Sequence, residues 1–470
     1  MARKRKQIRL ENLSIESVAA EGKAVARHDG MVVFVKGAVP GDVVDVQVTK
    51  KRKAYMEGNP VHYHQYSDLR EEAVCDYFGT CGGCKWQMLN YQSQLEFKQQ
   101  QVADNLSRIG KVDLPEIAPI IGSVKTLRYR NKLEFTFSNK KWLTKDQIDT
   151  GEDLNRNGLG FHIPGLFDKV VDVETCHLME EPTNAIKNEV RSYAFANGLT
   201  FFDIRDQHGL LRNLMIRLTD IGELMVLVQF FEPDREAIEG LMAHLKEKFP
   251  EITSLLYVIN QKKNDTIFDQ EIVCYSGKDH IVEEMGGLKF KIGPKSFYQT
   301  NSAQAKVLYD KALEFAELSK EDLVYDLYTG TGTIANYCAS QAKKVIGIEY
   351  VEDAIKDAFV NAEVNGIENT DFYAGDMKDV LNDEFVAKNG QPDVIITDPP
   401  RAGMHEDVVN MILKLSPKKV VYVSCNPATQ ARDIALMSED YQVEKIQPVD
   451  MFPHTHHVEN IVLLVLKQDI

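Results

Sequence analysis

A cysteine at the end of a short apolar stretch is the first residue here whose chemistry needs an explanation. Residues 420–423 are rich in β-branched and aromatic side chains, which predicts a buried strand. Pro427 ends the ladder because proline has no N–H to donate, so Cys425 lies at the carboxyl end of that strand. Ligands bind at this edge in open α/β sheets. Taken alone, Cys425 is more typical of a packed interior cysteine, so its role depends on the rest of the chain.

Three more cysteines are close in sequence, at Cys75, Cys81 and Cys84, with glycines between them. The chain has seven cysteines in 470 residues, an odd number that does not fit a disulfide framework. Three clustered thiols indicate a metal centre, and Cys176, the next cysteine along the chain, is the best candidate for a fourth ligand. Zinc and a 4Fe–4S cluster both accept four thiolates, so the spacing leaves the metal open.

A glycine-rich turn in the last third of the chain has the pattern of a nucleotide-cofactor loop. It holds Gly330 and Gly332 and follows the strand-like residues 323–327. The next predicted strand ends at Glu349, whose carboxylate can accept both hydroxyls of a ribose. A third strand leads to Asp376, a candidate for an adenine contact. The same turn satisfies a loose nicotinamide-cofactor fingerprint, so the turn alone does not identify the cofactor.

The residues after the fourth predicted strand favour S-adenosylmethionine over a nicotinamide. Asp398, Pro399 and Pro400 stand there, and Asp-Pro-Pro at this place is typical of methyltransferases that act on nucleobases. One alternative is an enzyme that methylates an exocyclic amine. Such enzymes usually carry an aromatic residue after the two prolines, where this chain has Arg401.

These residues require a multidomain α/β chain to position them. Residues 289–470 alternate strands and helices, which predicts a Rossmann-like, doubly wound catalytic sheet. Residues 1–60 have short strands and Gly/Pro turns, which predicts an OB-like β barrel. Residues 61–85 and 118–288 form the predicted central β-rich domain that carries the cysteine centre. Residues 86–117 are predicted to form a helix that packs on the catalytic domain. Its apolar stripe runs through Tyr91, Leu95, Phe97, Val102, Leu106 and Ile109.

The charge distribution indicates a local contact with RNA. The whole chain has a net charge of −15, but residues 1–60 hold 12 basic and 7 acidic side chains, a local net of +5. The basic arm of residues 3–6 is equally well explained as a solvated chain end. No apolar run is long enough to span a bilayer, and no secretory signal follows the basic start. We therefore expect a cytoplasmic protein with no membrane association and no obligate protein partner.

The motifs together are similar to one family. The chain resembles the RNA (uracil-5-)-methyltransferases, in particular the branch that has a TRAM domain and a 4Fe–4S cluster and modifies 23S ribosomal RNA. The resemblance covers almost the whole chain and is carried by Gly22, Gly37, Pro40, Gly41 and Asp42 in the barrel, by the four cysteines, and by residues 296–301, 326–333, 398–401, 424–427 and 452–459.

This resemblance implies a role for each motif. It implies cofactor contacts from Gln299, Tyr328, Glu349 and Asp398, a nucleophile at Cys425 and a base at Glu459. It also favours 4Fe–4S over zinc on Cys75, Cys81, Cys84 and Cys176. The implied partner is RNA, 23S ribosomal RNA before or during ribosome assembly, with transfer RNA as the alternative.

Methylation of carbon 5 of uracil explains why a cysteine and a carboxylate are needed. Carbon 5 is too weak a nucleophile unaided, but addition of a thiolate to carbon 6 makes it enolate-like. A base must then remove the carbon 5 proton, and Glu459 precedes the apolar residues 461–464, where an unpaired carboxylate would be costly. A non-catalytic iron–sulfur RNA-binding protein is the remaining alternative. Three histidines at 454, 456 and 457 present no complete zinc-ligand set.

Overall fold

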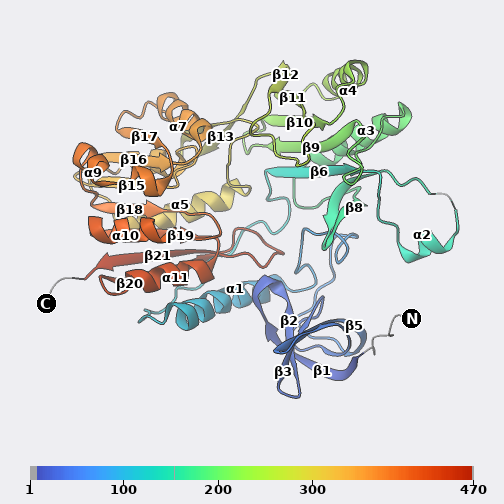
Figure 1. Ribbon diagram of the computed structural model, residues 1–470, viewed down its shortest axis with the longest axis horizontal. Helices are drawn as coiled ribbons and strands as arrows, with labels where there is room; N and C mark the ends of the chain where they lie inside the picture. The colour runs from blue at the N-terminus through green and yellow to red at the C-terminus, as the bar shows by residue number, and fades with distance from the viewer. Residues whose placement is uncertain (1–7, 153, 468–470) are drawn as a thin grey trace.

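The computed structural model describes residues 8–152 and 154–467 and has three parts (Figure 1). A barrel formed by the N-terminal residues lies below a central sheet, and a second sheet built from the C-terminal residues lies beside them (Figure 1). The predicted basic arm at residues 3–6 lies outside the described residues. Among the described residues, no helix has both the length and the apolar character needed to cross a membrane.

The N-terminal part is a closed barrel of five strands in the order β1-β2-β3-β5-β4, which confirms the predicted OB-like fold. Alternation along the strands fills its interior, where Val33 and Val35 are fully buried beside Val44 and Val46. The strands and the short turn between the first two are β1 (Arg9–Val18), η1 (Ala20–Gly22), β2 (Ala24–His28), β3 (Met31–Val35), β4 (Val43–Lys51) and β5 (Tyr55–Gln65).

The central part is a sheet of seven strands in the order β12-β11-β10-β9-β6-β7-β8. Helices α3 and α4 pack on one face, and the other face continues into the core of the C-terminal part. A separate two-stranded hairpin, β13 and β14, leads out of it. The elements are β6 (Lys132–Ser138), α2 (Lys145–Asp149), β7 (Gly158–Ile163), β8 (Leu166–Asp172), α3 (Thr183–Ala196), β9 (Leu211–Leu218), β10 (Leu224–Phe230), α4 (Arg235–Lys248), β11 (Ser254–Ile259), β12 (Ile272–Gly277), β13 (Ile281–Met285) and β14 (Leu288–Ile292).

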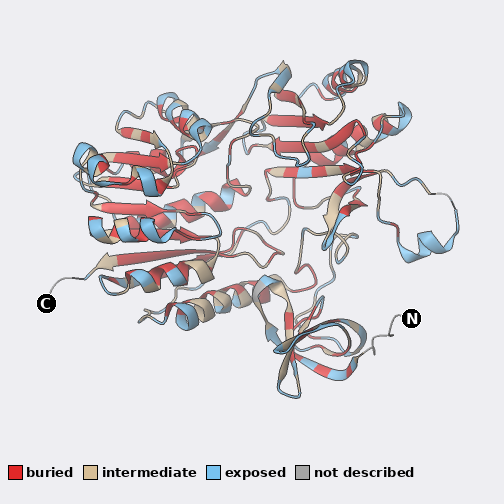
Figure 2. Ribbon diagram, in the orientation of Figure 1, coloured by how far each residue is buried: buried red, intermediate tan, exposed pale blue. Residues whose placement is uncertain are grey.

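The C-terminal part is the predicted doubly wound sheet, with strand order β17-β16-β15-β18-β19-β21-β20. The first five strands are parallel, and β21 runs antiparallel to β19. Its strands are buried on both faces (Figure 2), as parallel sheets covered by helices require. The elements are α5 (Ser302–Ala316), β15 (Leu323–Leu327), α6 (Thr333–Ala339), β16 (Lys344–Glu349), α7 (Glu352–Val364), β17 (Thr370–Ala374), α8 (Met377–Val380), α9 (Asp383–Asn389), β18 (Val394–Thr397), α10 (Glu406–Leu415), β19 (Lys419–Ser424), α11 (Pro427–Met437), β20 (Tyr441–Val449) and β21 (Glu459–Leu466).

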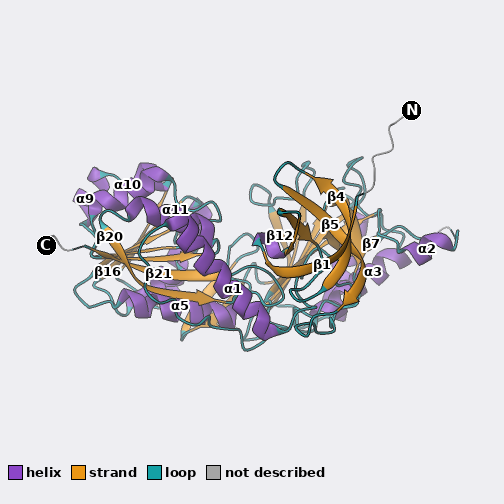
Figure 3. Cartoon of the chain, turned by 90° about the horizontal axis from the view of Figure 1, so that it is seen from below, coloured by secondary structure: helices purple, strands orange, loops and turns teal. Residues whose placement is uncertain are grey.

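One helix connects the parts. Helix α1 (Tyr91–Asn105) and the wider turn η2 (Leu106–Gly110) that follows it run along the C-terminal sheet beside α11 (Figure 3). The predicted stripe is only partly right, because Val102 is buried as expected while Ile109 is 43% exposed. The buried face instead includes the polar side chains of Gln94 and Lys98. Contacts with distant polar groups, described below, determine which face of this helix is buried.

Candidate functional site

Four predicted site residues end neighbouring strands at one edge of the C-terminal sheet. In the register, Leu327 of β15 lies between Ile348 of β16 and Thr397 of β18. The residues that follow these three in the chain are Tyr328, Glu349 and Asp398. They therefore lie side by side at the carboxyl edge of the sheet. Asp376 follows β17 at the same edge, where it caps helix α8.

Cys425 and Glu459 lie close together at the carboxyl edge of the sheet. Ser424, the last residue of β19, pairs with Asn460 of the antiparallel strand β21, so Cys425 follows one member of this pair and Glu459 precedes the other. The Glu459 carboxylate is near enough to raise the pKa of the Cys425 thiol. Cys425 is half-buried and Glu459 is only 4% exposed. The structure thus brings the predicted nucleophile and the predicted base together at the edge that holds Asp398.

The electrostatics of this edge favour the protonated forms. Burial, together with the nearby Glu459 and Asp398 carboxylates, raises the pKa of the Cys425 thiol to about 11, and the Arg401 guanidinium partly opposes this shift. Burial and the neighbouring Asp398 also raise the pKa of Glu459, again opposed by Arg401. The pKa of Asp398 is raised by burial. Groups that exchange protons near neutral pH are typical of acid–base sites.

The glycine-rich turn is held by the predicted ribose-binding residue. The backbone N–H groups of Gly330 and Val351 donate to the two oxygens of Glu349 at 3.2 and 3.0 Å. Tyr328 and Gly330 both have positive φ values, 65° and 56°, which give the turn its sharp course. Asp326, beneath the turn, accepts a hydrogen bond from the Thr329 hydroxyl, and burial raises its pKa to about 7.

Gln299 reaches the same region from the segment before α5. Its backbone carbonyl accepts a hydrogen bond of 2.8 Å from the side chain of Asn131, which also donates to the Ser302 hydroxyl at 2.8 Å. The Gln299 side chain lies within reach of the buried Tyr309 hydroxyl. Because Asn131 leads into strand β6, the central part fixes the position of this cofactor candidate.

The four predicted metal-binding cysteines surround one cavity. Cys75, Cys81, Cys84 and Cys176 all line a cavity of about 400 Å³ in the central part. Burial is the main cause that raises the pKa of Cys84 to about 11 and of Cys176 to about 12. Cys176 is separated by more than ninety positions from the other three in the chain, so folding has assembled the set. Half-buried thiols that share a cavity are a donor set for a thiolate-bound metal.

Comparison with known proteins identifies the family. Residues 223–467 match the tRNA (Uracil-5-)-methyltransferase family, and residues 4–61 match the TRAM domain. The chain belongs to the tRNA (uracil-5-)-methyltransferase family. An uncharacterized RNA methyltransferase of Bacteroides thetaiotaomicron is 58% identical over 454 residues, which cover 96% of this chain and all of the relative. One from Chlorobaculum tepidum is 40% identical over 457 residues, which cover 96% and 95% of the two chains.

A solved structure shares the whole architecture. The tRNA (uracil-54, C5)-methyltransferase of Pyrococcus abyssi, in complex with S-adenosyl-L-homocysteine, has a TM-score of 0.74 and 28% identity. The alignment covers 97% of this chain and all of that one. The chain is therefore an RNA methyltransferase that uses S-adenosylmethionine, as predicted. These matches exclude the nicotinamide alternative and the non-catalytic one.

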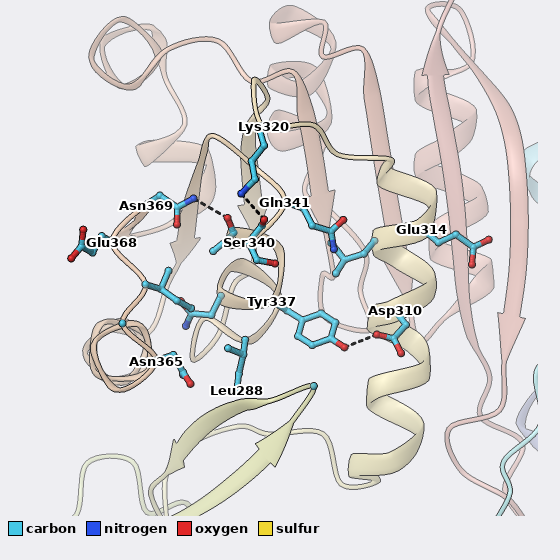
Figure 4. A pocket seen from close by; sticks show the side chains of 16 residues that line it. Leu288, Asp310, Glu314, Lys320, Tyr337, Ser340, Gln341, Asn365, Glu368 and Asn369 are labelled. Carbon is cyan, nitrogen blue, oxygen red and sulfur yellow. Dashed lines mark hydrogen bonds between the residues drawn. The ribbon is translucent and has the colours of Figure 1, made fainter.

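A second cavity of this methyltransferase lies away from these residues. It has a volume of about 970 Å³ and opens between α5, α6 and the end of α7, with Asp310, Lys320, Tyr337, Asn365 and Asn369 in its wall (Figure 4). Several of its wall residues precede strands, so it opens at the amino edge of the sheet. None of the predicted site residues lines it.

Sequence reasoning missed a buried polar cluster between α1 and the residues that follow β20. Lys98, fully buried in α1, donates to Asp450 at 2.6 Å, and the Tyr91 hydroxyl donates to the same carboxylate at 2.8 Å. Gln94, also fully buried, accepts a hydrogen bond from the backbone N–H of His454 at 2.8 Å. The sequence holds one signal of this cluster: polar residues lie among the apolar residues of α1, a helix that is predicted to pack on the catalytic domain. This signal does not identify the partners of those polar residues.

Proposed function

We propose that the protein methylates carbon 5 of a uridine in RNA through a covalent bond between Cys425 and carbon 6. The observation that carries the proposal is the proximity of Cys425 to Glu459 and Asp398, at the edge of the sheet where the glycine-rich turn follows β15. An exocyclic-amine methyltransferase needs no thiol at that position. S-adenosylmethionine supplies the electrophilic methyl group, and we assign its binding to Gln299, Tyr328, Glu349, Asp376 and Asp398.

The proposed steps use Cys425 and Glu459 in sequence. The Cys425 thiolate adds to carbon 6, and the electron pair of the 5,6 double bond moves onto carbon 5 and the adjoining carbonyl. Carbon 5 then takes the methyl group. Glu459 removes the carbon 5 proton, the double bond forms again, and the carbon–sulfur bond breaks to release the thiolate. A raised pKa of Glu459 suits it to accept a proton and to pass it on near neutral pH. To reach Cys425, the uracil must leave its stack.

We assign an iron–sulfur centre to the four cysteines. A tetrahedral zinc site with bonds of about 2.3 Å places its sulfurs roughly 3.8 Å apart. Among the described residues, the groups of ligand atoms that lie within 4.8 Å of one another do not include these sulfurs. The wider spacing around a cavity of about 400 Å³ suits a cluster of several atoms. The cluster would be held by Cys75, Cys81, Cys84 and Cys176 and would neutralise their buried thiolates.

We propose 23S ribosomal RNA as the substrate. The support is the resemblance of the sequence, with its barrel motif and its four cysteines, to the branch of the family that modifies that RNA. The solved relative with 28% identity acts on uridine 54 of transfer RNA. Transfer RNA is therefore the second candidate. Mapping of 5-methyluridine in both RNAs, from cells with and without the gene, separates the two.

The decisive experiment replaces the nucleophile. Cys425→Ala should retain binding of RNA and cofactor, give no adduct with 5-fluorouridine RNA, and transfer no methyl group. Cys274→Ala is the matched control, since that thiol is exposed on β12. Methyl transfer at the native rate by Cys425→Ala would overturn the mechanism.

A further inference from the structure

The segment that joins β20 to β21 is where the parts of the molecule meet. It covers residues 450–458 and ends directly before Glu459. We call it the catalytic segment. Helix α1 holds it at Asp450 and His454, and Asn301, the cap of α5, donates to the Met451 carbonyl at 2.9 Å. The position of the proposed base therefore depends on elements far from it in sequence.

Residues next to a cysteine hold the middle of this segment. The backbone N–H groups of Lys85 and Trp86 donate to the His454 carbonyl at 2.8 and 3.0 Å. These two residues follow Cys84 directly. Gln94 closes the arrangement: its amide donates to the Trp86 and Leu89 carbonyls at 3.1 and 2.7 Å and accepts from the His454 N–H.

A second connection runs from another residue that lines the cysteine cavity. Arg130 lines that cavity, and its guanidinium lies 5.6 Å from the centre of the Phe452 ring. Its neighbour Tyr129 donates from its hydroxyl to the Pro453 carbonyl at 3.1 Å. Two independent sets of contacts thus link the cysteine cavity to the catalytic segment.

The backbone of His454 shows that these contacts fix an unfavourable conformation. Its φ is 63°, in the left-handed region, which residues with a side chain adopt only at an energetic cost. Both its N–H and its carbonyl are bonded to the residues just described. Such a conformation persists only while its surroundings hold it. Loosening of residues 84–86 would allow His454 to relax and would release the segment that leads to Glu459.

We infer that the cysteine centre positions the proposed base: a filled centre holds residues 84–86 and Arg130, and these hold the catalytic segment so that Glu459 lies near Cys425. The inference rests on the proposed function only for the role of Glu459. It makes Gln94 a positioning residue and gives the metal centre a purpose that needs no electron transfer.

Hydrogen exchange on the full-length protein tests the connection without reference to activity. Amide exchange is measured in anaerobically purified protein and after removal of the metal with a chelator. We expect peptides that cover 84–89 and 450–458 to exchange at least tenfold faster after removal, while strand β16 stays unchanged. Faster exchange confined to residues 75–84, with 450–458 unchanged, would overturn the inference.

The Gln94→Met variant tests the effect on the reaction. A displaced base slows only the last step, so the methylated RNA adduct should accumulate on ordinary uridine RNA to at least tenfold the native level. Adduct formation with 5-fluorouridine RNA should stay within twofold, because that base has no carbon 5 proton to remove. Gln92→Met, an exposed position on the same helix, is the control. An equal fall in every step would mean that Gln94 only stabilises the fold, and would overturn its positioning role.

The two experiments separate the inference from the proposed function. If the native protein forms no adduct even with 5-fluorouridine RNA, the proposed mechanism is wrong, and the exchange measurement still decides whether the centre holds the catalytic segment. If Gln94→Met does not fold, the exchange measurement on the native chain decides the inference alone.

Discussion

Cys425 follows Ser424 at the end of β19, and Glu459 precedes Asn460, the residue of β21 that pairs with Ser424. This neighbourhood places the Glu459 carboxylate near the Cys425 thiol, where it raises the cost of ionising that thiol. In water, an isolated thiol is a few per cent thiolate near neutral pH, and here the raised pKa lowers that fraction. The site therefore needs a positive charge nearby, and Arg401 is the side chain that lowers both pKa values.

Arg401 should set the pH dependence of adduct formation. Because the pKa of Cys425 is about 11, the thiolate fraction rises about tenfold per pH unit below that value, and the rate should rise with it. Arg401→Gln removes the charge that opposes the shift, so the whole profile should move to higher pH. Arg401→Lys keeps the charge and should move it less.

The measurement is the rate of adduct formation with 5-fluorouridine RNA between about pH 7 and pH 10. A profile for Arg401→Gln that superimposes on the native one would show that this guanidinium does not act on the thiol.

Loss of one cysteine should release the metal. The native protein is expected to be brown and to hold about four iron atoms per chain. Cys84→Ser replaces a thiolate with a weak ligand, so the colour and most of this iron should be lost. Cys274→Ser, on the exposed edge of β12, should keep them. Iron, zinc and sulfide are measured on anaerobically purified protein. Stoichiometric zinc without sulfide in the native protein would contradict the 4Fe–4S assignment.

Glu349 should contribute to cofactor affinity. Hydrogen bonds to a charged group are worth about 1.5–3 kcal/mol, so Glu349→Ala should weaken S-adenosylmethionine binding by about 10- to 150-fold. It also removes the acceptor for the Gly330 N–H. Calorimetric titration provides the measurement, with Glu352→Ala, exposed at the start of α7, as the control. Equal affinities in the two variants would remove Glu349 from the site.

The basic run after strand β4 should carry part of the affinity for RNA. Lys51, Arg52 and Lys53 are exposed, whereas Lys50 is paired with Glu57 at 2.9 Å. Changing the three exposed residues to Gln should raise KM for long RNA and reduce the slope of log K against log salt by up to about 2. The kcat should stay unchanged. A fall in kcat with an unchanged salt slope would place the RNA elsewhere.

The residues at strand ends could be predicted because parallel strands share one carboxyl edge. Cys425, Glu349 and Asp398 each follow an apolar run, so their convergence needs only the sheet. The contact between Lys98 and Asp450 could not be predicted in this way. The two residues are 352 positions apart in the chain, and a lysine on a helix is ordinarily expected to be exposed to solvent. The same limit explains why the apolar stripe predicts only part of the buried face of α1. Val102 is buried as the periodicity predicts, whereas Gln94 and Lys98 are buried because their partners lie in the catalytic segment.

The last prediction tests the order of the steps at Glu459. Glu459→Gln keeps the size and most of the hydrogen-bonding capacity of the side chain but removes the base. Cys425 should still add to carbon 6, and carbon 5 should still accept the methyl group. The adduct should then persist, because the thiolate cannot leave until the carbon 5 proton has gone.

The expected product of Glu459→Gln is a protein–RNA complex that survives denaturing electrophoresis and carries the labelled methyl group. Cys425→Ala and the double variant should give none, which ties the complex to the thiol. With 5-fluorouridine RNA, Glu459→Gln and the native protein should form equal amounts of adduct. The fluorinated base has no carbon 5 proton, so the step that needs Glu459 is blocked in both proteins. Turnover of Glu459→Gln at the native rate would show that another group is the base. Loss of both turnover and the 5-fluorouridine adduct would mean that Glu459 instead holds the fold or the target base.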